Sequence, residues 1–395
     1  MITVRLGDVC QTFTGGTPSR TKPQYFGGGI PWVKITDMLQ GTVLATDESL
    51  SDDGIANSSA KVLPVGTVLI SIFATIGRTA VLGIEAATNQ AIAGVIPKDT
   101  QQLQSDYLRY FLDSKHSELN RVARGVAQPN INQGILKGLE IPIPPLSEQR
   151  RIVDILSRAE GIVRLRREAE KKAAELIPGI FLEMFGDPAT NQRGWPRDQL
   201  GGLLSNIDSG ISPRCHDRKK TNGEWGVLRL SALTGGEYNE AEHKTLPEEI
   251  EATPSIEVKA GDVLVSRKNT YELVGTCSYV WETVGHMLLP DLIFRLKIRD
   301  AQKLHPIYLW VLLGLPAKRS QIKQLASGSA GSMPNISKQR LMTLPVELPP
   351  IGHQVCFSEA VAQIRGIRIQ QAAATAKAQA TFDALLAQAF SASLI

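Results

Sequence analysis

The sequence predicts a mixed α/β protein in which two globular α/β domains are separated by two long helices that pair antiparallel as a coiled coil. Two observations predict this fold class: motifs that recur after about 200 residues, and two long segments with apolar residues at helical spacing. At 395 residues the chain is long enough for two domains with cores of their own. The repeat implies pseudo-two-fold internal symmetry. The expected pieces are residues 1–145, 146–186, 187–350 and 351–395.

The repeat is visible as short motifs that keep their order in both halves of the chain. A strand-like run, Gly66–Ser71, is matched almost position for position by Gly261–Ser266. The offset drifts further along the chain, because the loops of the two copies differ in length. Other matched motifs are Leu6-Gly7 with Leu200-Gly201, Tyr107-Leu108 with Tyr308-Leu309, Pro129-Asn130-Ile131 with Pro334-Asn335-Ile336, and Gln149 with Gln354.

Each globular copy is expected to mix short strands with short helices. Runs such as 65–73 and 262–266 alternate with turns marked by Gly and Pro, whereas 107–115 and 308–315 are typical of helices. Both copies end in paired prolines. Consecutive prolines continue neither a helix nor a strand ladder, so the chain is expected to leave each domain in an extended conformation.

The segments after the paired prolines are predicted to be long amphipathic helices. Ser147 is expected to be the N-cap of the first helix, and Gly186 is expected to end it. A stripe this long needs a partner, and the natural partner is the stripe of the other copy. Packing of each helix on its own domain is the alternative. The first stripe consists of Ile152, Ile155, Leu156, Ala159, Val163, Ala169, Ala173, Leu176 and Ile180, and the second of Phe357, Val361, Ile364, Ile367, Ala374, Ala378, Phe382 and Leu385.

The composition favours a cytoplasmic protein without membrane contact. No run approaches the roughly 18 apolar residues that a membrane helix needs, and the start of the chain lacks the form of a signal peptide. The four cysteines lie far apart without metal-ligand spacing and are expected to be reduced thiols. A net charge of +4 does not by itself indicate nucleic-acid binding.

A search for catalytic motifs is negative. The chain lacks the Asp/Asn-Pro-Pro-Tyr/Phe motif of adenine methylation, a glycine-rich AdoMet loop, Gly-x-Ser-x-Gly and a His-x-x-x-His zinc motif. The turn at 15–20 lacks the Lys-Ser/Thr ending of a nucleotide-binding P-loop. We therefore expect a non-catalytic protein that binds no metal.

A single chain with internal two-fold symmetry and two globular copies held apart resembles a dimeric DNA reader. In such readers the protein's geometry sets the spacing of two half-sites, typically ~34 Å. Helix length, at ~1.5 Å per residue, would then fix the number of unread bases. Because the two copies differ strongly in sequence, the half-sites in double-stranded DNA are expected to differ as well. The expected target is bipartite and asymmetric.

The motifs resemble those of type I restriction–modification specificity subunits. The run Ile141–Val153 looks like the boundary motif of that family, and Leu182–Pro188 is similar to the end of its central helix. The opening of the chain also resembles the family, in Leu6-Gly7-Asp8, Gly15–Ser19 and Ile30–Lys34. The resemblance spans the whole chain, and the order and duplication of the motifs make it specific.

The resemblance implies a division of labour among subunits. Each globular copy would be a target recognition domain, and the paired helices would act as a spacer that helps to dock two methyltransferase subunits. Translocase–nuclease subunits would join the assembly to cleave unmodified DNA. AdoMet, ATP and Mg²⁺ are expected on those partner subunits and no cofactor on this chain. The second copy departs from the family pattern at His353, where the first copy has Glu148.

Candidate DNA contacts are side chains that read bases or bind phosphates, chiefly Arg, Lys, Asn and Gln. In the first copy they lie in the turn after Gly15, at the end of a strand-like run, and in three polar loops; simple turns or exposed surface are the alternatives. The candidates there are Thr17, Ser19, Arg20, Lys22, Lys34, Arg78, Asn89, Gln90, Arg124, Gln128 and Asn130.

In the second copy the best candidates directly follow a strand, at Arg267-Lys268-Asn269, with Tyr271 placed to pack on a sugar or base. The basic run at 218–220 is either a phosphate patch or solvated surface. Helix capping by Asn130 and Asn335 is the alternative for that repeated pair. The candidates are Arg214, Lys219, Lys220, Arg229, Arg267, Lys268, Asn269, Tyr271, Ser329 and Asn335.

The alternative function is a coiled-coil scaffold or adaptor whose globular domains bind protein or another ligand. A DNA reader neutralises phosphates and therefore binds duplex DNA in a salt-dependent way, whereas a scaffold shows no such binding. An enzyme with unfamiliar motifs is a third hypothesis, which the negative motif search disfavours.

Overall fold

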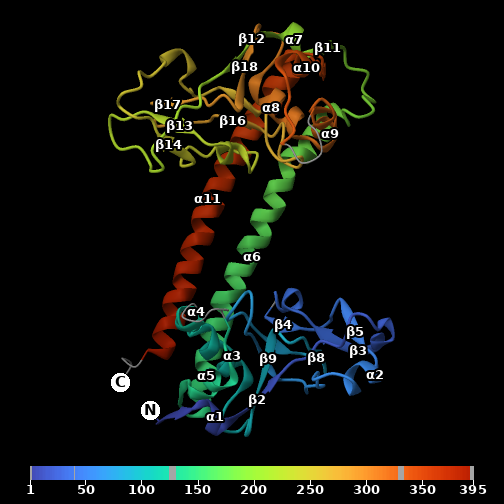
Figure 1. Cartoon of the computed structure of the whole chain (residues 1–395), viewed down its shortest axis with the longest axis vertical. Helices are drawn as coiled ribbons and strands as arrows, with labels where there is room; N and C mark the ends of the chain where they lie inside the picture. The colour runs from blue at the N-terminus through green and yellow to red at the C-terminus, as the bar shows by residue number, and fades with distance from the viewer. Residues whose placement is uncertain (1, 40, 124–129, 328–332, 392–395) are drawn as a thin grey trace. The chain divides into compact units, whose positions relative to one another are not determined.

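A computed structural model describes residues 2–39, 41–123, 130–327 and 333–391 (Figure 1). The chain forms two compact units by its internal contacts. Unit 1 contains Met1–Arg167 and Ala373–Ile395, and unit 2 contains Glu168–Ala372. Each unit therefore combines one α/β domain with part of each of the two long helices.

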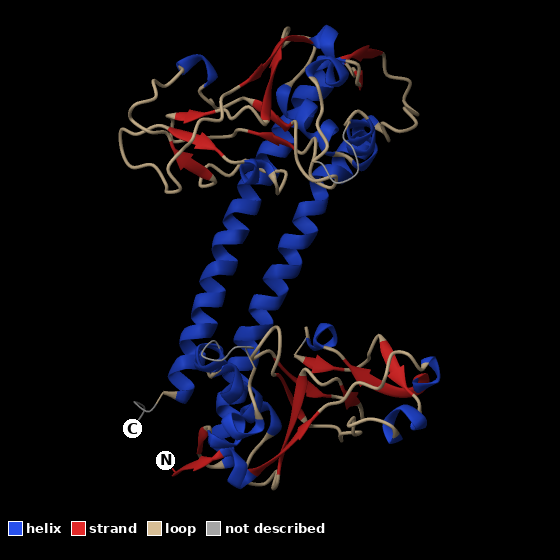
Figure 2. Cartoon of the chain, in the orientation of Figure 1, coloured by secondary structure: helices blue, strands red, loops and turns tan. Residues whose placement is uncertain are grey.

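The domain of unit 1 contains a five-stranded sheet in the order β2-β9-β6-β7-β4, a three-stranded sheet in the order β5-β3-β8, and the antiparallel ribbon β1-β10 (Figure 2). Its strands are β1 (Ile2–Arg5), β2 (Cys10–Thr14), β3 (Phe26–Val33), β4 (Thr42–Val43), β5 (Glu48–Leu50), β6 (Val68–Ser71), β7 (Thr79–Leu82), β8 (Ala87–Thr88), β9 (Ile92–Pro97) and β10 (Glu140–Ile143). Its helices are α1 (Leu6–Val9), η1 (Pro23–Tyr25), η2 (Ile35–Met38), α2 (Asp52–Ala56), α3 (Ser105–Ser114), α4 (His116–Ala123) and α5 (Gln133–Gly138).

The domain of unit 2 contains sheets in the orders β12-β18-β15-β16 and β14-β13-β17, and the antiparallel ribbon β11-β19. Its strands are β11 (Arg197–Gln199), β12 (Leu204–Ser209), β13 (Gly226–Leu228), β14 (His243–Thr245), β15 (Val263–Ser266), β16 (Cys277–Tyr279), β17 (Met287–Leu288), β18 (Ile293–Ile298) and β19 (Pro345–Glu347). Its helices are α7 (Leu200–Leu203), η3 (Leu230–Leu233), η4 (Pro254–Ile256), α8 (Pro306–Gly314), α9 (Pro316–Gln324) and α10 (Lys338–Met342).

The two domains share one topology. When β4 is set aside, the order β2-β9-β6-β7 corresponds to β12-β18-β15-β16, and β5-β3-β8 corresponds to β14-β13-β17. In both small sheets one edge strand, β5 or β14, is antiparallel to the central strand. The other edge strand, β8 or β17, is parallel to it. The motif repeat is thus a repeat of fold, and the prediction of two α/β domains is confirmed.

The matched apolar runs form a strand that is buried on both faces. In β6, Val68 and Ile70 join the core cluster beneath α3, while Leu69 belongs to a second cluster on the opposite face. In β15, Val265 and Leu264 are divided between two clusters in the same way. Because neither face meets water, the strand reads as a continuous apolar run without polar alternation.

The long helices are α6 (Leu146–Phe185) and α11 (Ile351–Phe390). In unit 1, Leu156 near the start of α6 shares a core cluster with Leu386 near the end of α11. In unit 2, Phe185 at the end of α6 lies 5.4 Å, ring centroid to centroid, from Phe357 near the start of α11. The two helices therefore pack antiparallel, as predicted, and packing of each helix on its own domain alone is wrong.

Two details of the helix predictions are wrong. The helix starts at Leu146, and the carbonyl of Pro145 accepts from the backbone N–H groups of Glu148 and Gln149, so Ser147 lies inside the first turn and is not the N-cap. The predicted apolar stripe is also out of register near the end of α6. Leu176, which the stripe predicts to be buried, is 50% exposed, while its neighbour Ile177 is 6% exposed.

The phase error has a physical cause in the domain core. Phe181 stacks on Tyr308 of α8 at 5.4 Å, so this end of α6 faces its domain as well as the partner helix. Ile367 of the second predicted stripe is likewise 54% exposed. The end of α6 is as predicted, because Gly186 has φ +78°, the left-handed conformation that terminates helices. No helix in the described part of the chain is apolar over enough of its length to cross a membrane.

Each domain is joined to its long helix by a fully buried glutamine amide. In unit 1, the Oε1 of Gln149 accepts from the N–H of Gln104 at 3.0 Å, and its Nε2 donates to the carbonyls of Gln102 and Pro144. These bonds satisfy backbone N–H and carbonyl groups just before α3 and just before α6. Gln354 makes the same three bonds in unit 2, to His305, Lys303 and Pro349. The repeated Gln is therefore a structural anchor.

Candidate nucleic-acid interface

A cluster of cations and aromatic rings forms around Glu48 in unit 1. The guanidinium of Arg20 lies 4.4 Å above the ring of Phe26 and is ion-paired with Glu48 at 2.8 Å. Lys34, which precedes η2, binds the other carboxylate oxygen of Glu48 at 3.0 Å. Two candidates that are fourteen residues apart in sequence are thus brought together by one carboxylate.

The electrostatics of this cluster favour the charged forms of Glu48 and Lys34. Hydrogen bonds from Arg20 and then Lys34 lower the pKa of Glu48, and the hydrogen bond to Glu48 raises the pKa of Lys34. The groups are exposed enough to exchange partners with solvent ions. A phosphate could therefore replace Glu48 as the partner of either cation.

The remaining candidates of unit 1 shape the neighbouring turns. Thr17 donates from its hydroxyl to the side chain of Gln90, which links the two predicted loops. The side chain of Asn89 accepts from the N–H of Ala91 at 3.1 Å, so it supports its own turn. Ser19 lies 2.8 Å from the hydroxyl of Thr21, Lys22 donates to the hydroxyl of Tyr25, Arg78 is half-buried near the carbonyl of Ile35, and Asn130 forms a β-bridge with Phe73.

Unit 2 repeats the arrangement of a cation and a carboxylate at the corresponding position. Arg229, which precedes η3 as Lys34 precedes η2, is ion-paired with Asp217 and donates to the carbonyl of His243. Lys244 approaches the same Asp217 oxygen at 3.7 Å. Arg214 is exposed in the same loop region.

The basic run at 218–220 is partly engaged within the fold. Arg218 binds Glu224, and the ammonium of Lys219 donates to the carbonyl of Ala241. Lys220 contributes its backbone N–H to His243 at 3.0 Å. The run therefore offers less uncompensated charge than its sequence suggests.

The loop after β15 turns its three polar residues in different directions. The Nε of Arg267 donates to Asn335 at 3.2 Å, and Lys268 is exposed. Asn269 is 7% exposed and bonds the N–H of Thr270, so it supports the loop. Tyr271 is 61% exposed, with the ammonium of Lys323 at 5.3 Å from its ring.

Three candidates, Arg124, Gln128 and Ser329, lie outside the described residues. Helix capping by Asn130 and Asn335, the alternative for that pair, is wrong: the caps of α5 and α10 are Asn132 and Ser337. The structure instead brings Asn335 to Arg267, across a large separation in sequence.

Sequence reasoning missed the two carboxylates that organise the cations. Glu48 lies on β5, whereas Asp217 lies in a loop before β13, so no shared motif marks them. Their role depends on strand pairing, in which Glu48 lies opposite Trp32. A spacing rule could not have found either residue.

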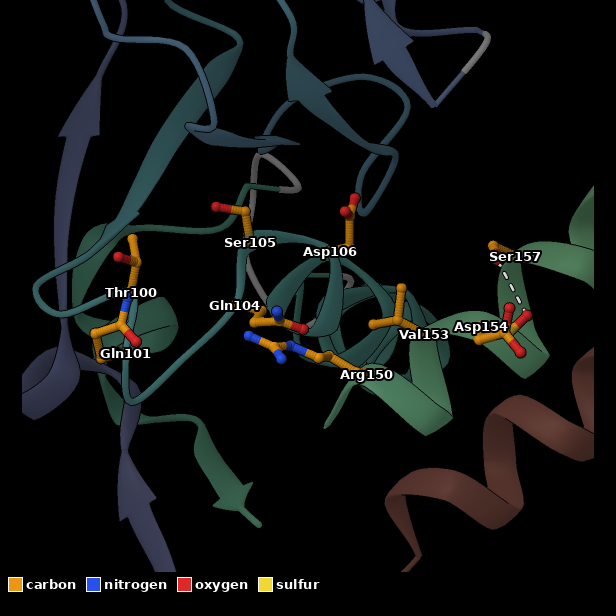
Figure 3. A pocket seen from close by; sticks show the side chains of 9 residues that line it. All are labelled: Thr100, Gln101, Gln104, Ser105, Asp106, Arg150, Val153, Asp154 and Ser157. Carbon is orange, nitrogen blue, oxygen red and sulfur yellow. Dashed lines mark hydrogen bonds between the residues drawn. The ribbon is translucent and has the colours of Figure 1, made fainter. Parts of the chain in front are cut away.

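A polar hollow of about 690 Å³ lies elsewhere in unit 1, beside the Gln149 anchor (Figure 3). The start of α3 and the first turns of α6 form its walls, and none of the predicted DNA contacts lines it. Its lining residues are Thr100, Gln101, Gln104, Ser105, Asp106, Arg150, Val153, Asp154 and Ser157.

Comparisons with known proteins agree with this architecture. Residues 1–175 match the family described as type I restriction modification DNA specificity domain. The specificity subunit of the type I restriction enzyme MjaIX from Methanocaldococcus jannaschii is 28% identical over 59% of this chain and 58% of its own length. The EcoEI specificity subunit from Escherichia coli is 30% identical over 51% of this chain and 34% of its own length. The chain thus spans about half the length of these relatives.

A solved structure has a similar fold over the whole chain. It was described in a study of complex assembly and conformational transition of the type I restriction–modification system, and it matches with a TM-score of 0.59, 22% identity, and coverage of 100% of this chain and 98% of its own. A crystal structure of a type I restriction–modification S subunit from M. genitalium also matches, with a TM-score of 0.53, 13% identity, and coverage of 100% of this chain and 96% of its own. These likenesses show the fold: two α/β domains with two long packed helices. Residues 1–175 thus match the type I restriction modification DNA specificity domain, and the chain is similar to specificity subunits of type I restriction enzymes.

Proposed function

We propose that this chain selects a bipartite, asymmetric sequence in double-stranded DNA, with one half-site contacted by the domain of each unit. The observation that carries the proposal is the repeated placement of a cation, Lys34 or Arg229, directly after the central strand of the small sheet. The strand order is the same in both domains while the side chains around these cations differ. Two equivalent scaffolds with different polar edges suit two different half-sites.

The recognition domains are proposed to be residues 1–145 and 187–350, with residues 146–186 and 351–395 as spacer helices. The number of unread base pairs between the half-sites would depend on the length of these helices. In each domain, the ion pair with Glu48 or Asp217 holds a cation ready in the absence of DNA, and a phosphate or base edge replaces the carboxylate on binding.

We further propose that the chain works inside a larger assembly. The helices would help to dock two methyltransferase subunits, and translocase–nuclease subunits would complete the complex. The similar solved structure comes from a study of how a type I system assembles, which supports an assembled state for this chain as well. Methylation and cleavage, with AdoMet, ATP and Mg²⁺, would belong to those partners.

The test uses the full chain with its methyltransferase partner. Binding to duplex DNA over a salt series should weaken steeply with salt, and methylome sequencing should give a motif with two unlike halves. Lys34→Ala should relax one half of the motif and Arg229→Ala the other, each by ~1–3 kcal/mol of discrimination if the residue reads a base. Lys303→Ala removes an exposed cation paired with Asp198 and serves as the control. Salt-independent or absent duplex binding would favour a scaffold.

A further inference from the structure

A bidentate ion pair joins the domain of unit 1 to α6. The guanidinium of Arg109 on α3, 6% exposed, donates to both oxygens of Glu160 at 3.0 and 2.7 Å. The hydroxyl of Tyr110 donates to the same carboxylate at 2.9 Å. Burial alone would raise the pKa of Glu160, but the bond and charge of Arg109 outweigh it and the pKa is lowered. Glu160 is therefore held as an anion.

Shared anchors identify the equivalent positions in unit 2. Tyr107 and Tyr308 each donate to the carbonyl of the matching ribbon strand at 2.9 Å, so Arg109, two residues after Tyr107, corresponds to Trp310. Gln149 and Gln354 make the same bonds, so Glu160, eleven residues after Gln149, corresponds to Arg365. The charge on the helix is reversed.

The contact in unit 2 follows a different chemistry. The guanidinium of Arg365 lies 4.9 Å from the ring of Trp281, whose ring lies 6.1 Å from that of Trp310. Arg365 also binds Glu282 at 3.0 Å. In unit 2 a cation on the helix thus lies over the ring of Trp281, whereas in unit 1 an anion on the helix faces a cation of the domain.

Each of these contacts also lies beside the loop that follows the candidate DNA cation. Gly41 and Gly236 are equivalent glycines in this loop, with φ +75° and +76°. A Cβ at Gly41 would lie 3.6 Å from the Nη1 of Arg109, and the indole N–H of Trp310 donates to the carbonyl of Gly236 at 3.2 Å. The loop lies seven residues beyond Lys34 or Arg229.

We propose that these two contacts act as clasps, meaning contacts that fix each recognition domain on one particular helix. Glu160 positions the domain of unit 1 on α6 and Arg365 positions the domain of unit 2 on α11, so the two domains are not interchangeable. A domain with Arg109 placed on α11 would meet Arg365, a like charge. A domain with Trp281 placed on α6 would turn a ring face toward the carboxylate of Glu160. The inference rests on the proposed function, since each clasp positions the loop beside one half-site.

The experiment compares charge variants of the full chain, with and without its methyltransferase partner. Glu160→Arg should speed amide hydrogen exchange in α3 and residues 41–44, and reduce discrimination at the half-site of unit 1 by ~10-fold or more. Arg109→Glu should do the same, and the double variant Arg109→Glu/Glu160→Arg should recover most of both losses. Arg365→Glu should affect unit 2 alone.

Matched variants keep the result interpretable. Asp154→Arg makes the same charge change on α6 at an exposed pair with Arg158, and should leave exchange and both half-sites unchanged. Glu160→Gln keeps an acceptor for Arg109 and folds more readily than Glu160→Arg, so its smaller, unit-1-specific loss is a second test. A merely structural role would weaken both half-sites together and would show no charge-swap recovery.

Failure of the clasp and failure of the proposed function are distinguishable. If the unmodified chain shows no duplex selectivity, the proposed function fails, while the exchange measurements still test the clasp. Unchanged exchange in α3 after Glu160→Arg, equal losses at both half-sites, or a double variant no better than its parents would overturn the inference.

Discussion

The two units share their topology and their glutamine anchors but differ in the chemistry around them. The anchors satisfy backbone groups, whose positions are fixed by the fold, so the same side chain serves in both units. The contacts between domain and helix join side chains to side chains. Both members of such a contact can change together without disturbing the backbone. The ion pair of Arg109 with Glu160 in unit 1 therefore corresponds to Arg365 over the ring of Trp281 in unit 2.

A second difference lies beneath the antiparallel ribbon of unit 2. Lys318, fully buried on α9, donates to Glu347 at 3.0 Å and to the carbonyl of Pro345 at 2.6 Å. The corresponding positions of unit 1 are Ser117 and Pro142, which form no such pair. Unit 2 thus depends on a buried ion pair where unit 1 does not, and the pair offers a way to break the equivalence of the units.

The largest effect is expected for Lys318→Met. It leaves Glu347, 3% exposed, with the half-exposed Arg197 as its remaining ionic partner, and removal of one member of a buried pair typically costs ~3–5 kcal/mol. Urea unfolding and hydrogen exchange should show the loss in unit 2, with unit 1 unaffected. Lys318→Met/Glu347→Gln should recover part of it.

Lys303→Met, at an exposed pair with Asp198, is the control and should change the free energy of unfolding by less than ~1 kcal/mol. Equal stability of Lys318→Met and Lys303→Met would mean that the buried pair contributes nothing specific to unit 2.

A smaller effect, equal in both units, is expected for Gln149→Glu and Gln354→Glu. A carboxylate still accepts from the N–H at the start of α3 or α8, but it cannot donate to the two carbonyls that the amide binds. Each variant should lose ~1–3 kcal/mol, read as faster exchange at Gln104 or His305 respectively. Strongly unequal losses would show that the shared anchor has different roles in the two units.

Much of the fold could be predicted because it follows from the spacing of apolar residues along the chain. The run that becomes β6 and its repeat in β15 are buried on both faces, and they matched almost position for position. The phase of the helix stripe could not be predicted, because Phe181 faces Tyr308 of the domain as well as α11. A heptad pattern assumes a single partner helix.

Less of the candidate site could be predicted. Residue types identified Lys34 and Arg229, but their carboxylate partners come from unrelated elements. Asn269 has a side chain of the type that reads bases, yet it is buried. Its amide oxygen accepts from the backbone N–H of Thr270 in the same loop. Loop geometry, which sequence periodicity does not encode, decides which polar group faces outward.

The smallest expected effect is a difference between the two units in how their stability depends on pH. Burial lowers the pKa of His305, whose Nδ1 accepts from the N–H of Ile307 and lies 2.8 Å from the hydroxyl of Ser358. A base with a lowered pKa in the folded state stabilises fully above its ordinary value of 6.5 and less as pH falls below it. Unit 1 has Gln104 at this position, which does not titrate.

Unit 1 should respond in the opposite direction. Burial raises the pKa of Asp113 to about 6, although Arg109 and Thr79 oppose the shift. An acid with a raised folded pKa binds a proton on folding, so unit 1 gains stability as pH falls through about 6. Between pH 7 and 5.5, hydrogen exchange should therefore speed up in α8 relative to α3. His305→Gln should remove the change in α8 and Asp113→Asn the change in α3; parallel responses of the two helices in the unmodified chain would rule out this difference between the units.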